Sequence, residues 1–330
     1  MMKLPKKVIV CEDVTRDGFQ SAVKEVAAED KVRIIDLAAD AGVTCFEVGA
    51  FTPNSQSMRK MWNTKEVFRL LRQREGISYR ALIFDEDGVR EAYEAGCPKV
   101  KINISASNAH HKSGAGMTTE EALKQFAGIG RFAGQHGIEM CGSISLPFVS
   151  PFPGEGVIPM EWLKHIIRGF VEIGITEISL SDAAGLGNPQ MIYERFTQLK
   201  EEFCQVSWML HMHNTWGMGL AGVLAALEAG VTKFDASLAG LGGCPYLPGA
   251  TGNVATEDLV FMLNKMGIET GIDVKKLIPA GQMVRRIVEN TGTDSVIQRN
   301  YDRGALKQAH SDLLQEIKER KPLRIWTFRL

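Results

Sequence analysis

The sequence predicts an α/β protein folded as a (β/α)8 TIM barrel with extra C-terminal helices, and three observations support this fold class. Short apolar runs alternate with segments of helical periodicity from Val8 to Met266. The repeat is roughly 30–40 residues long, which is typical of such barrels. The chain of 330 residues is long enough for one large barrel, or for two ordinary domains. After about residue 270 the alternation stops. We therefore expect a barrel domain over residues 1–270 and a helical extension packed on it over 271–330.

The first half of the chain supplies four strand–helix repeats. The expected strands are short apolar runs at Val8–Cys11, Cys45–Gly49, Tyr79–Ile83 and Val100–Ser105. The expected helices follow them at Lys31–Ala41, around Val67–Leu71, at Val89–Ala95, and after Thr118 or Thr119. The first helix stops at Gly42, and the fourth has a capping threonine followed by two glutamates in its first turn. We expect a loop rich in Gly, Ser and His over Ser107–Met117.

The second half supplies four more repeats of the same kind. Its expected strands are Ile138–Leu146, Glu177–Asp182, Val206–Leu210 and Lys233–Leu238. Its expected helices are Trp162–Ile173, Pro189–Phe203, the small-residue segment Leu220–Ala226, and Ala255–Met266. Long loops follow the fifth strand (Pro147–Pro159) and the eighth (Gly240–Gly252). Val274–Val288 and Ala305–Lys318 are the added helices, and Glu319–Leu330 is an expected tail.

A doubly wound open sheet is the alternative fold. A GxGxxG turn after the first strand would favour it, and that motif does not occur there. Gly185-Leu186-Gly187 and Gly240-Leu241-Gly242-Gly243 match it only in part. The barrel therefore remains the preferred prediction.

Composition limits the classes of partner. The formal net charge is -1, so no overall field favours nucleic acid or an anionic membrane. The sequence contains no apolar run of the length a membrane span requires, and we expect no membrane association. Val8–Cys11 is too short to be the apolar core of a signal peptide. Six cysteines form no CxxC pair, which favours reduced thiols in the cytoplasm.

The sequence His211-Met212-His213 marks the end of the seventh strand. Side chains alternate along a strand, so the two histidines point the same way and Met212 points the other. Two imidazoles on one face, at the C-terminal end of a strand, can bind one divalent metal ion. The alternative is that two polar residues simply leave a buried strand together.

Other polar residues also lie at the carboxyl ends of the predicted strands, where barrel enzymes place their working groups. They are Arg16, Asp17, Gln20, Glu47, Asp182, Cys244 and Asn253. A carboxylate, two imidazoles and an amide oxygen suit octahedral Mg²⁺ or Mn²⁺ better than structural zinc. Glu47 lies in an apolar strand, where a charge is costly without a partner, so we favour a site role for it.

Each candidate also has an ordinary structural explanation. Asp17 and Asn253 are residue types common in turns, and Arg16 can be a salt-bridge partner of Glu47. Asp182 can cap the helix that begins near Asn188, and Cys244 can be an inert small residue. The adjacent pair His110 and His111 is interpreted as polar loop residues that contact a substrate tail.

One segment carries a family resemblance. Ala239–Tyr246, followed by Gly249-Ala250 and Gly252–Val260, resembles the signature loop of the 3-hydroxy-3-methylglutaryl-CoA lyase family, with its cysteine at Cys244. Thr15-Arg16-Asp17-Gly18-Phe19-Gln20 is similar to the family's first-strand motif. Glu47, Glu177–Asp182 and His211-x-His213 fall where that family has its acid, its sixth-strand aspartate and its metal histidines. The resemblance covers roughly residues 7–290.

The resemblance implies a divalent-metal-dependent retro-Claisen cleavage of a tertiary 3-hydroxyacyl-CoA. The expected reaction converts 3-hydroxy-3-methylglutaryl-CoA, or a close acyl analogue, to acetyl-CoA and a keto acid such as acetoacetate. The implied ligands of Mg²⁺ or Mn²⁺ are Asp17, His211, His213 and Asn253. The resemblance also implies an acyl-CoA substrate and a homodimer.

It further implies roles for individual side chains. Asp17 or His211 takes the hydroxyl proton, and Arg16 offsets charge on the enolate oxygen. Cys244, on a mobile loop, protonates the carbanion. Glu47 and Asp182 orient the hydroxyl, the metal water or the histidines.

Three departures from the family pattern bear on the acyl group. The stretch Ser145–Pro153 after the fifth strand is bulkier and more apolar than the family's small-residue turn. Thr52–Ser57 lacks the usual Ser-Pro-Lys, and Asn214 stands where an aspartate is common. A related lyase with a different acyl group is thus one possibility.

Three functions other than 3-hydroxyacyl-CoA cleavage are also compatible with a barrel of this kind. They are a 4-hydroxy-2-oxo acid aldolase, a Claisen-type synthase and a non-catalytic binding barrel. Cys244 argues against the aldolase and the synthase, because those enzymes do not need this thiol. The complete metal set argues against the binding barrel.

Overall fold

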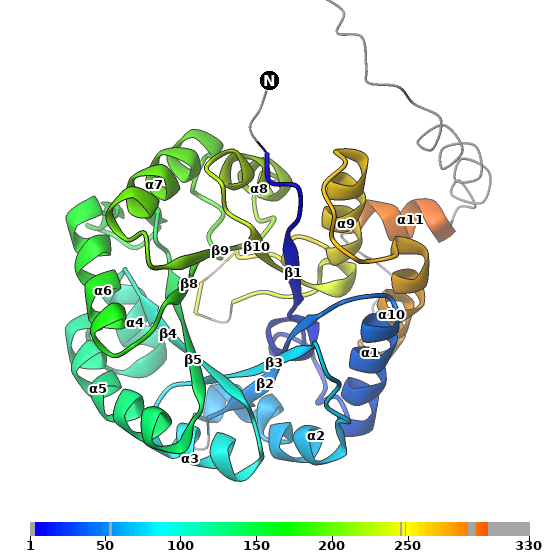
Figure 1. Cartoon of the computed structure of the whole chain (residues 1–330), viewed down its shortest axis with the longest axis horizontal. Helices are drawn as coiled ribbons and strands as arrows, with labels where there is room; N and C mark the ends of the chain where they lie inside the picture. The colour runs from blue at the N-terminus through cyan, green and yellow to red at the C-terminus, as the bar shows by residue number, and fades with distance from the viewer. Residues whose placement is uncertain (1–3, 53–54, 245, 248, 290–294, 303–330) are drawn as a thin grey trace, which may run out of the picture.

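The computed structural model describes residues 4–52, 55–244, 246–247, 249–289 and 295–302. Within them, eight parallel strands close into a barrel that is surrounded by helices (Figure 1). The strand order around the barrel is β1-β10-β9-β8-β5-β4-β3-β2. The predicted (β/α)8 fold is therefore confirmed.

The barrel strands match the eight predicted apolar runs to within a few residues. They are β1 (Ile9–Glu12), β2 (Cys45–Phe51), β3 (Ser78–Ile83), β4 (Lys99–Ser105), β5 (Glu139–Ser145), β8 (Glu177–Asp182), β9 (Ser207–Met212) and β10 (Lys233–Ala236). Closure pairs β1 with β10 in parallel, with Ile9 opposite Lys233. This closure brings the residues that follow β1, β9 and β10 to the same rim of the barrel.

The helices form the outer layer (Figure 1). They are α1 (Ala28–Asp40), α2 (Thr64–Leu70), α3 (Glu86–Glu94), α4 (Asn108–Ala115), α5 (Thr119–His136), α6 (Met160–Glu172), α7 (Pro189–Glu202), α8 (Gly219–Glu228) and α9 (Thr256–Lys265). Thr118 is the residue that caps α5: its hydroxyl accepts from the Glu121 amide at 3.2 Å, and the Glu121 carboxylate accepts from the Thr118 amide at 2.7 Å. The apolar residues between this layer and the strands form one continuous core.

Two local predictions differ from the structure. The expected loop at Ser107–Met117 contains helix α4, whose N-terminal cap is Ser107 and whose C-terminal cap is Gly116 at φ 72°. Its glycines and histidines give no apolar periodicity, which hid it. The loop after β5 holds a short antiparallel hairpin, β6 (Val149–Ser150) and β7 (Gly156–Val157).

The C-terminal extension begins with α10 (Val274–Ile287), which lies beside α1 (Figure 1). The Asp273 amide donates to the Ala41 carbonyl at 2.8 Å, and Gly42 adopts a φ of 104° directly against Gly271. Helix α11 (Val296–Asp302) contacts α9 and α10. The expected helix at Ala305–Lys318 and the tail at Glu319–Leu330 lie outside the described residues. The division at residue 270 stays a prediction.

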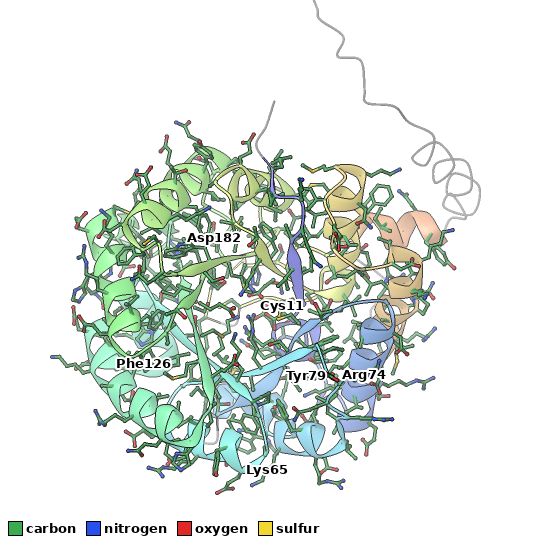
Figure 2. The ribbon with its side chains drawn as sticks, viewed as in Figure 1. Cys11, Lys65, Arg74, Tyr79, Phe126 and Asp182 are labelled. Carbon is green, nitrogen blue, oxygen red and sulfur yellow. The ribbon has the colours of Figure 1, made fainter. Side chains whose placement is uncertain are left out.

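The barrel interior carries charges as well as apolar groups. Arg80 on β3 donates to Asp235 on β10 at 2.6 Å, and these strands are not neighbours, so the contact crosses the interior. A small buried cluster of Cys11, Cys45 and Met209 lies with it, and Figure 2 shows Cys11 near the middle of the barrel. Among the described residues, no helix has the length and apolar character needed to cross a membrane.

Candidate active site

The first part of the site is a buried turn directly after β1. Residues Val14–Gly18 form a single π-helical turn, η1, whose residues are all buried. The Asp13 carboxylate caps it by accepting from the Asp17 amide at 3.3 Å. A Cβ on Gly18 would lie 2.8 Å from Val14 Cγ2, so only glycine fits the close approach there. The turn directs Arg16 and Asp17 into the mouth of the barrel.

The two histidines at the end of β9 each have an oxygen acceptor beside Nδ1. His211 Nδ1 lies 3.2 Å from Asp235 Oδ2, and His213 Nδ1 lies 2.8 Å from the Thr251 carbonyl oxygen. A carbonyl or carboxylate oxygen accepts a hydrogen bond, so each Nδ1 carries the proton and each Nε2 keeps its lone pair. His213 Nε2 lies 3.5 Å from Asp17 Oδ2. Both rings therefore offer Nε2 as a ligand atom.

Asp17, His211 and His213 come together as predicted. Each is buried, and one ligand atom from each lies within 4.8 Å of the others. Asn253 joins them through its amide, whose Nδ2 donates to Asp17 Oδ2 at 2.7 Å. One carboxylate, two imidazoles and an amide suit a divalent cation of the Mg²⁺ or Mn²⁺ kind. The residues present fit such an ion.

A second group, Asp13, His211 and Asp235, is equally close-packed. It uses the Nδ1 edge of His211, 3.6 Å from Asp13 and 3.2 Å from Asp235. These two carboxylates orient the imidazole. The group that contains Asp17 and His213 is therefore the better candidate for binding a metal ion.

Burial and the surrounding charges shift the pKa values of the candidate ligand residues. Burial alone would raise the pKa of Asp17, but Arg16 and the two histidines lower it below its usual value. Burial lowers the pKa of His213 to about 4, so this ring is neutral near pH 7. Burial would lower the pKa of His211 as well, but Asp235 raises it above its usual value.

Glu47 stands at the centre of a buried ion network. It accepts from Arg16 Nε at 2.5 Å, from Arg80 Nε at 2.8 Å and from Lys101 Nζ at 2.7 Å. Burial would raise the pKa of Glu47, but these cations hold it well below its usual range. The interpretation of Arg16 as a salt-bridge partner of Glu47 is therefore correct as a description of the contact. Glu47 contacts Arg16 rather than the histidines.

Four members of this network were not predicted. They are Asp13, Arg80, Lys101 and Asp235. Asp235 accepts from Arg80 and Lys101 while it also holds His211, so it joins the network to the candidate metal ligands. Each of Arg80, Lys101 and Asp235 is a charge inside an apolar strand, and that is the signal that singled out Glu47.

Cys244 lies on the loop after β10, between the candidate metal ligands and helix α4. A Cβ on Gly242 of this loop would lie 3.2 Å from Asp17 Oδ2, so the loop passes directly over the cluster. Cys244 Sγ lies 3.8 Å from His110 Nε2, a contact that the sequence did not predict. Burial raises the pKa of the Cys244 thiol to about 11, so it is an S–H group at neutral pH. A partly buried, protonated thiol can serve as a proton donor.

Asp182 has a different place from the other candidates. Its carboxylate accepts from the amides of Gly185 at 3.0 Å and Gly187 at 2.7 Å, which fixes the loop after β8. Helix α7 is capped by Asn188 instead, so the cap proposed for Asp182 is wrong. The Asp182 carbonyl accepts from the His213 amide at 3.3 Å. Asp182 therefore contacts the candidate ligand His213 through its backbone.

A parallel barrel whose carboxyl-end rim carries one carboxylate and two oriented imidazoles defines a (β/α)8 protein with a candidate metal site. The model of the HMGL-like family matches residues 7–284. The chain belongs to the HMGL-like family, which confirms the resemblance.

Individual relatives agree with this assignment. The mitochondrial hydroxymethylglutaryl-CoA lyase of Mus musculus is 34% identical over 90% of this chain and 91% of its own. A 3-hydroxy-3-isohexenylglutaryl-CoA/hydroxymethylglutaryl-CoA lyase of Pseudomonas aeruginosa is 35% identical over 86% and 93%. The structure of an HMG-CoA lyase from Acinetobacter baumannii, in complex with coenzyme A and 3-methylmalate, has a TM-score of 0.84 at 32% identity. The match covers 89% of this chain and 95% of that one.

Proposed function

We propose that this protein is a divalent-metal-dependent carbon–carbon lyase that cleaves a tertiary 3-hydroxyacyl-CoA to acetyl-CoA and a keto acid. The substrate named by its relatives, 3-hydroxy-3-methylglutaryl-CoA, is the first candidate, and acetoacetate is then the second product. One observation carries the proposal. The donor cluster of Asp17, His211 and His213 lies under a loop that also presents a protonated thiol.

Asp17, His211, His213 and Asn253 are the proposed ligands of Mg²⁺ or Mn²⁺. A divalent cation held there polarises the substrate hydroxyl and the forming carbonyl oxygen. Asp17 or His211 accepts the hydroxyl proton. Asp235 supports His211 in that role because its carboxylate stabilises the protonated ring. The identity of the ion, Mg²⁺ or Mn²⁺, is part of the proposal.

The bond between the carbinol carbon and the acetyl carbon then breaks, and its electron pair becomes a thioester enolate. Arg16, a buried guanidinium at the rim, offsets the charge on the enolate oxygen. Cys244 donates its thiol proton to the enolate carbon, which completes acetyl-CoA. Glu47 acts through Arg16, whose Nε it holds at 2.5 Å. Asp182 acts by fixing the loop that adjoins His213.

An acyl-CoA panel assayed with and without metal tests the proposal. Acetyl-CoA release that EDTA abolishes, that Mn²⁺ or Mg²⁺ restores, and that Cys244→Ala strongly reduces is the expected result. Activity that Cys244→Ala leaves unchanged favours an aldolase or a synthase. Absence of metal binding favours a non-catalytic barrel. A homodimer and a cytoplasmic location are further parts of the proposal, and light scattering of the purified protein tests the first.

A further inference from the structure

The thiol that is proposed to protonate the enolate lies against an imidazole that the proposed mechanism does not use. Cys244 Sγ lies 3.8 Å from Nε2 of His110, a residue of helix α4 that is 134 positions away in the chain. The contact joins the loop after β10 to α4. A sulfur atom that loses its proton in the reaction therefore faces a ring nitrogen.

Helix α4 is anchored at its first turn, so His110 has a fixed position. The Glu155 carboxylate, from the loop between β6 and β7, accepts from the Ala109 amide at 2.9 Å and from the Ser107 hydroxyl. The Ser107 hydroxyl oxygen accepts from the His110 amide at 3.0 Å, which caps the helix. The Phe152 ring lies beside the imidazole, with the two ring centroids 6.0 Å apart. These contacts hold the ring next to the thiol.

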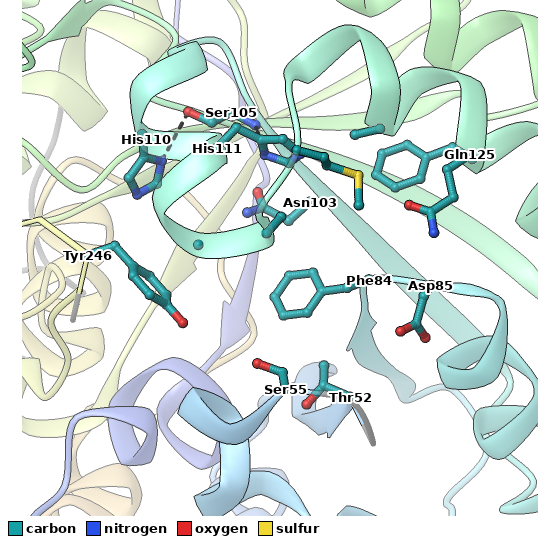
Figure 3. A pocket seen from close by; sticks show the side chains of 15 residues that line it. Thr52, Ser55, Phe84, Asp85, Asn103, Ser105, His110, His111, Gln125 and Tyr246 are labelled. Carbon is teal, nitrogen blue, oxygen red and sulfur yellow. Dashed lines mark hydrogen bonds between the residues drawn. The ribbon is translucent and has the colours of Figure 1, made fainter.

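The hydrogen bonds of Ser105 indicate which nitrogen of His110 carries the proton. Ser105 Oγ lies 3.0 Å from His110 Nδ1, and Figure 3 shows this contact as a dashed line. The other acceptor for the Ser105 hydroxyl proton is the Ser145 carbonyl at 3.4 Å, which is beyond the usual O–H···O range. The hydroxyl therefore donates to Nδ1. In a neutral ring the proton is then on Nε2, the nitrogen that faces Cys244.

The charges around this pair keep the ring neutral and make a thiolate costly. Burial and His111 lower the pKa of His110 to about 4, although Glu155 acts in the opposite direction. Burial and the Asp17 carboxylate raise the pKa of the Cys244 thiol, and the Arg16 guanidinium lowers it. A neutral N–H donor beside the sulfur stabilises a thiolate there without adding a charge.

We propose that His110 donates its Nε2–H to Cys244 Sγ and stabilises the thiolate that forms when Cys244 protonates the enolate carbon. The inference rests on the proposed lyase function and deepens its last step. In that step the S–H bond breaks and a C–H bond of acetyl-CoA forms, while the electron pair of the S–H bond stays on sulfur. Because the imidazole donates to the sulfur, the thiol proton is free to point at the substrate. The proton that Asp17 or His211 removed from the hydroxyl balances the one that Cys244 gave up, so the thiol is restored before the next turnover.

Alkylation of Cys244 by iodoacetamide tests the hydrogen bond without any substrate. The variants are made in a Cys204→Ser background, which removes the exposed thiol. His110→Phe keeps a ring and removes the N–H, whereas His110→Gln supplies an amide N–H near the position of Nε2. His136→Phe is the matched control, because His136 is an exposed histidine at the end of α5.

The rate of alkylation should fall in His110→Phe. A hydrogen bond to a charged group is worth about 10- to 100-fold in an equilibrium, so the acid dissociation constant of the thiol should fall by that factor. The more basic thiolate is also more nucleophilic, which offsets part of the change. We therefore expect the rate at pH 8 to fall about three- to tenfold. His110→Gln should restore most of the rate, and His136→Phe should leave it unchanged.

Turnover shows whether the hydrogen bond acts in the reaction. For metal-dependent acetyl-CoA release from 3-hydroxy-3-methylglutaryl-CoA, His110→Phe should lower kcat by about 10-fold and change KM by less than about threefold. His110→Gln should recover most of kcat, and His136→Phe should keep the wild-type values. A calorimetric Mn²⁺ titration should give the same affinity for all four proteins, which confirms that the metal site is intact.

Nitrogen-15 NMR of histidine-labelled wild type measures the tautomer of His110 directly, with His110→Gln used to assign its signals. A proton on Nε2 is the expected result, and a proton on Nδ1 would overturn the inference. This measurement does not require His110→Phe to fold.

Three other results would also overturn the inference, and they separate it from the proposed function. Unchanged alkylation in His110→Phe shows that no hydrogen bond reaches the sulfur. Slower alkylation with a raised KM and an unchanged kcat shows that His110 contacts the substrate tail and takes no part in the proton transfer. A wild type that binds metal but releases no acetyl-CoA from any acyl-CoA rejects the proposed function and the role of His110 in turnover, while alkylation and NMR still decide whether the hydrogen bond exists.

Discussion

Asp235 Oδ2 lies 3.2 Å from Nδ1 of His211, at the point where the buried ion network meets the candidate metal ligands. The same carboxylate accepts from Arg80 at 2.6 Å and from Lys101 at 3.3 Å. Asp235 therefore remains ionised in a buried position and fixes which nitrogen of His211 carries the proton. It does so from the interior of the barrel, one layer below the rim.

Asp235→Asn is expected to weaken metal binding by about 10- to 100-fold, the usual effect of losing the group that orients a ligand histidine. The amide removes the charge that holds the proton on His211 Nδ1. The measurement is a calorimetric titration with Mn²⁺. The matched control is Asp36→Asn, which removes an exposed carboxylate paired with Arg74 and should leave the affinity unchanged. Wild-type Mn²⁺ affinity in a folded Asp235→Asn protein would contradict the assigned orientation.

Metal binding should also stabilise the fold, because the ligands come from segments far apart in the chain. Asp17 follows β1, His213 follows β9 and Asn253 follows β10. A ligand at 100 times its Kd adds about 2.7 kcal/mol to the free energy of unfolding. We expect Mn²⁺ to raise the Tm of the wild type and EDTA to reverse the change. Asp17→Ala and His213→Ala should lose this response, and an unaltered response in both variants would place the ion elsewhere.

The fold and most of the candidate site could be predicted from the sequence, because the signals that indicate them are local in the chain. Strand and helix periodicity is a local signal, and strand ends converge on one rim of any parallel barrel. Asp17, His211, His213 and Asn253 were predicted together because each lies at or shortly after the end of a strand, or in the long segment after the last strand. The HMGL-like family model matches residues 7–284 and therefore supports the predicted fold over the whole barrel.

The site residues that the sequence did not predict are defined by contacts across the barrel. Arg80, Lys101 and Asp235 have their partners on strands distant in sequence, and no spacing along the chain pairs them. The contact of His110 with Cys244 depended on helix α4, whose glycines and histidines conceal its periodicity. A buried charge in an apolar strand is nevertheless a sequence signal, and applied beyond Glu47 it would have found the network.

Glu47→Gln should cost about 3–5 kcal/mol of unfolding free energy, the typical penalty for breaking a buried ion pair from one side. The amide leaves Arg16, Arg80 and Lys101 with one carboxylate fewer among them. Chemical denaturation of the metal-free protein measures the loss. Glu66→Gln, which breaks an exposed pair with Arg69, is the control and should have no measurable effect. Equal stabilities of the two variants would show that the network contributes little.

Cys244 provides the prediction for pH dependence. Its thiol has a pKa raised to about 11 by burial, and alkylation by iodoacetamide requires the thiolate. The thiolate fraction is therefore small at pH 7 and rises tenfold per pH unit until the pH approaches about 11. In a Cys204→Ser background, which removes the exposed thiol, the rate of alkylation should follow this slope while the protein remains folded.

The cleavage rate should not decline through loss of the Cys244 proton until the pH approaches about 11. Cys244→Ala should reduce kcat by about 10²- to 10⁴-fold. A rate of alkylation that has already levelled off below pH 7 would identify a thiolate at neutral pH and would exclude Cys244 as the proton donor.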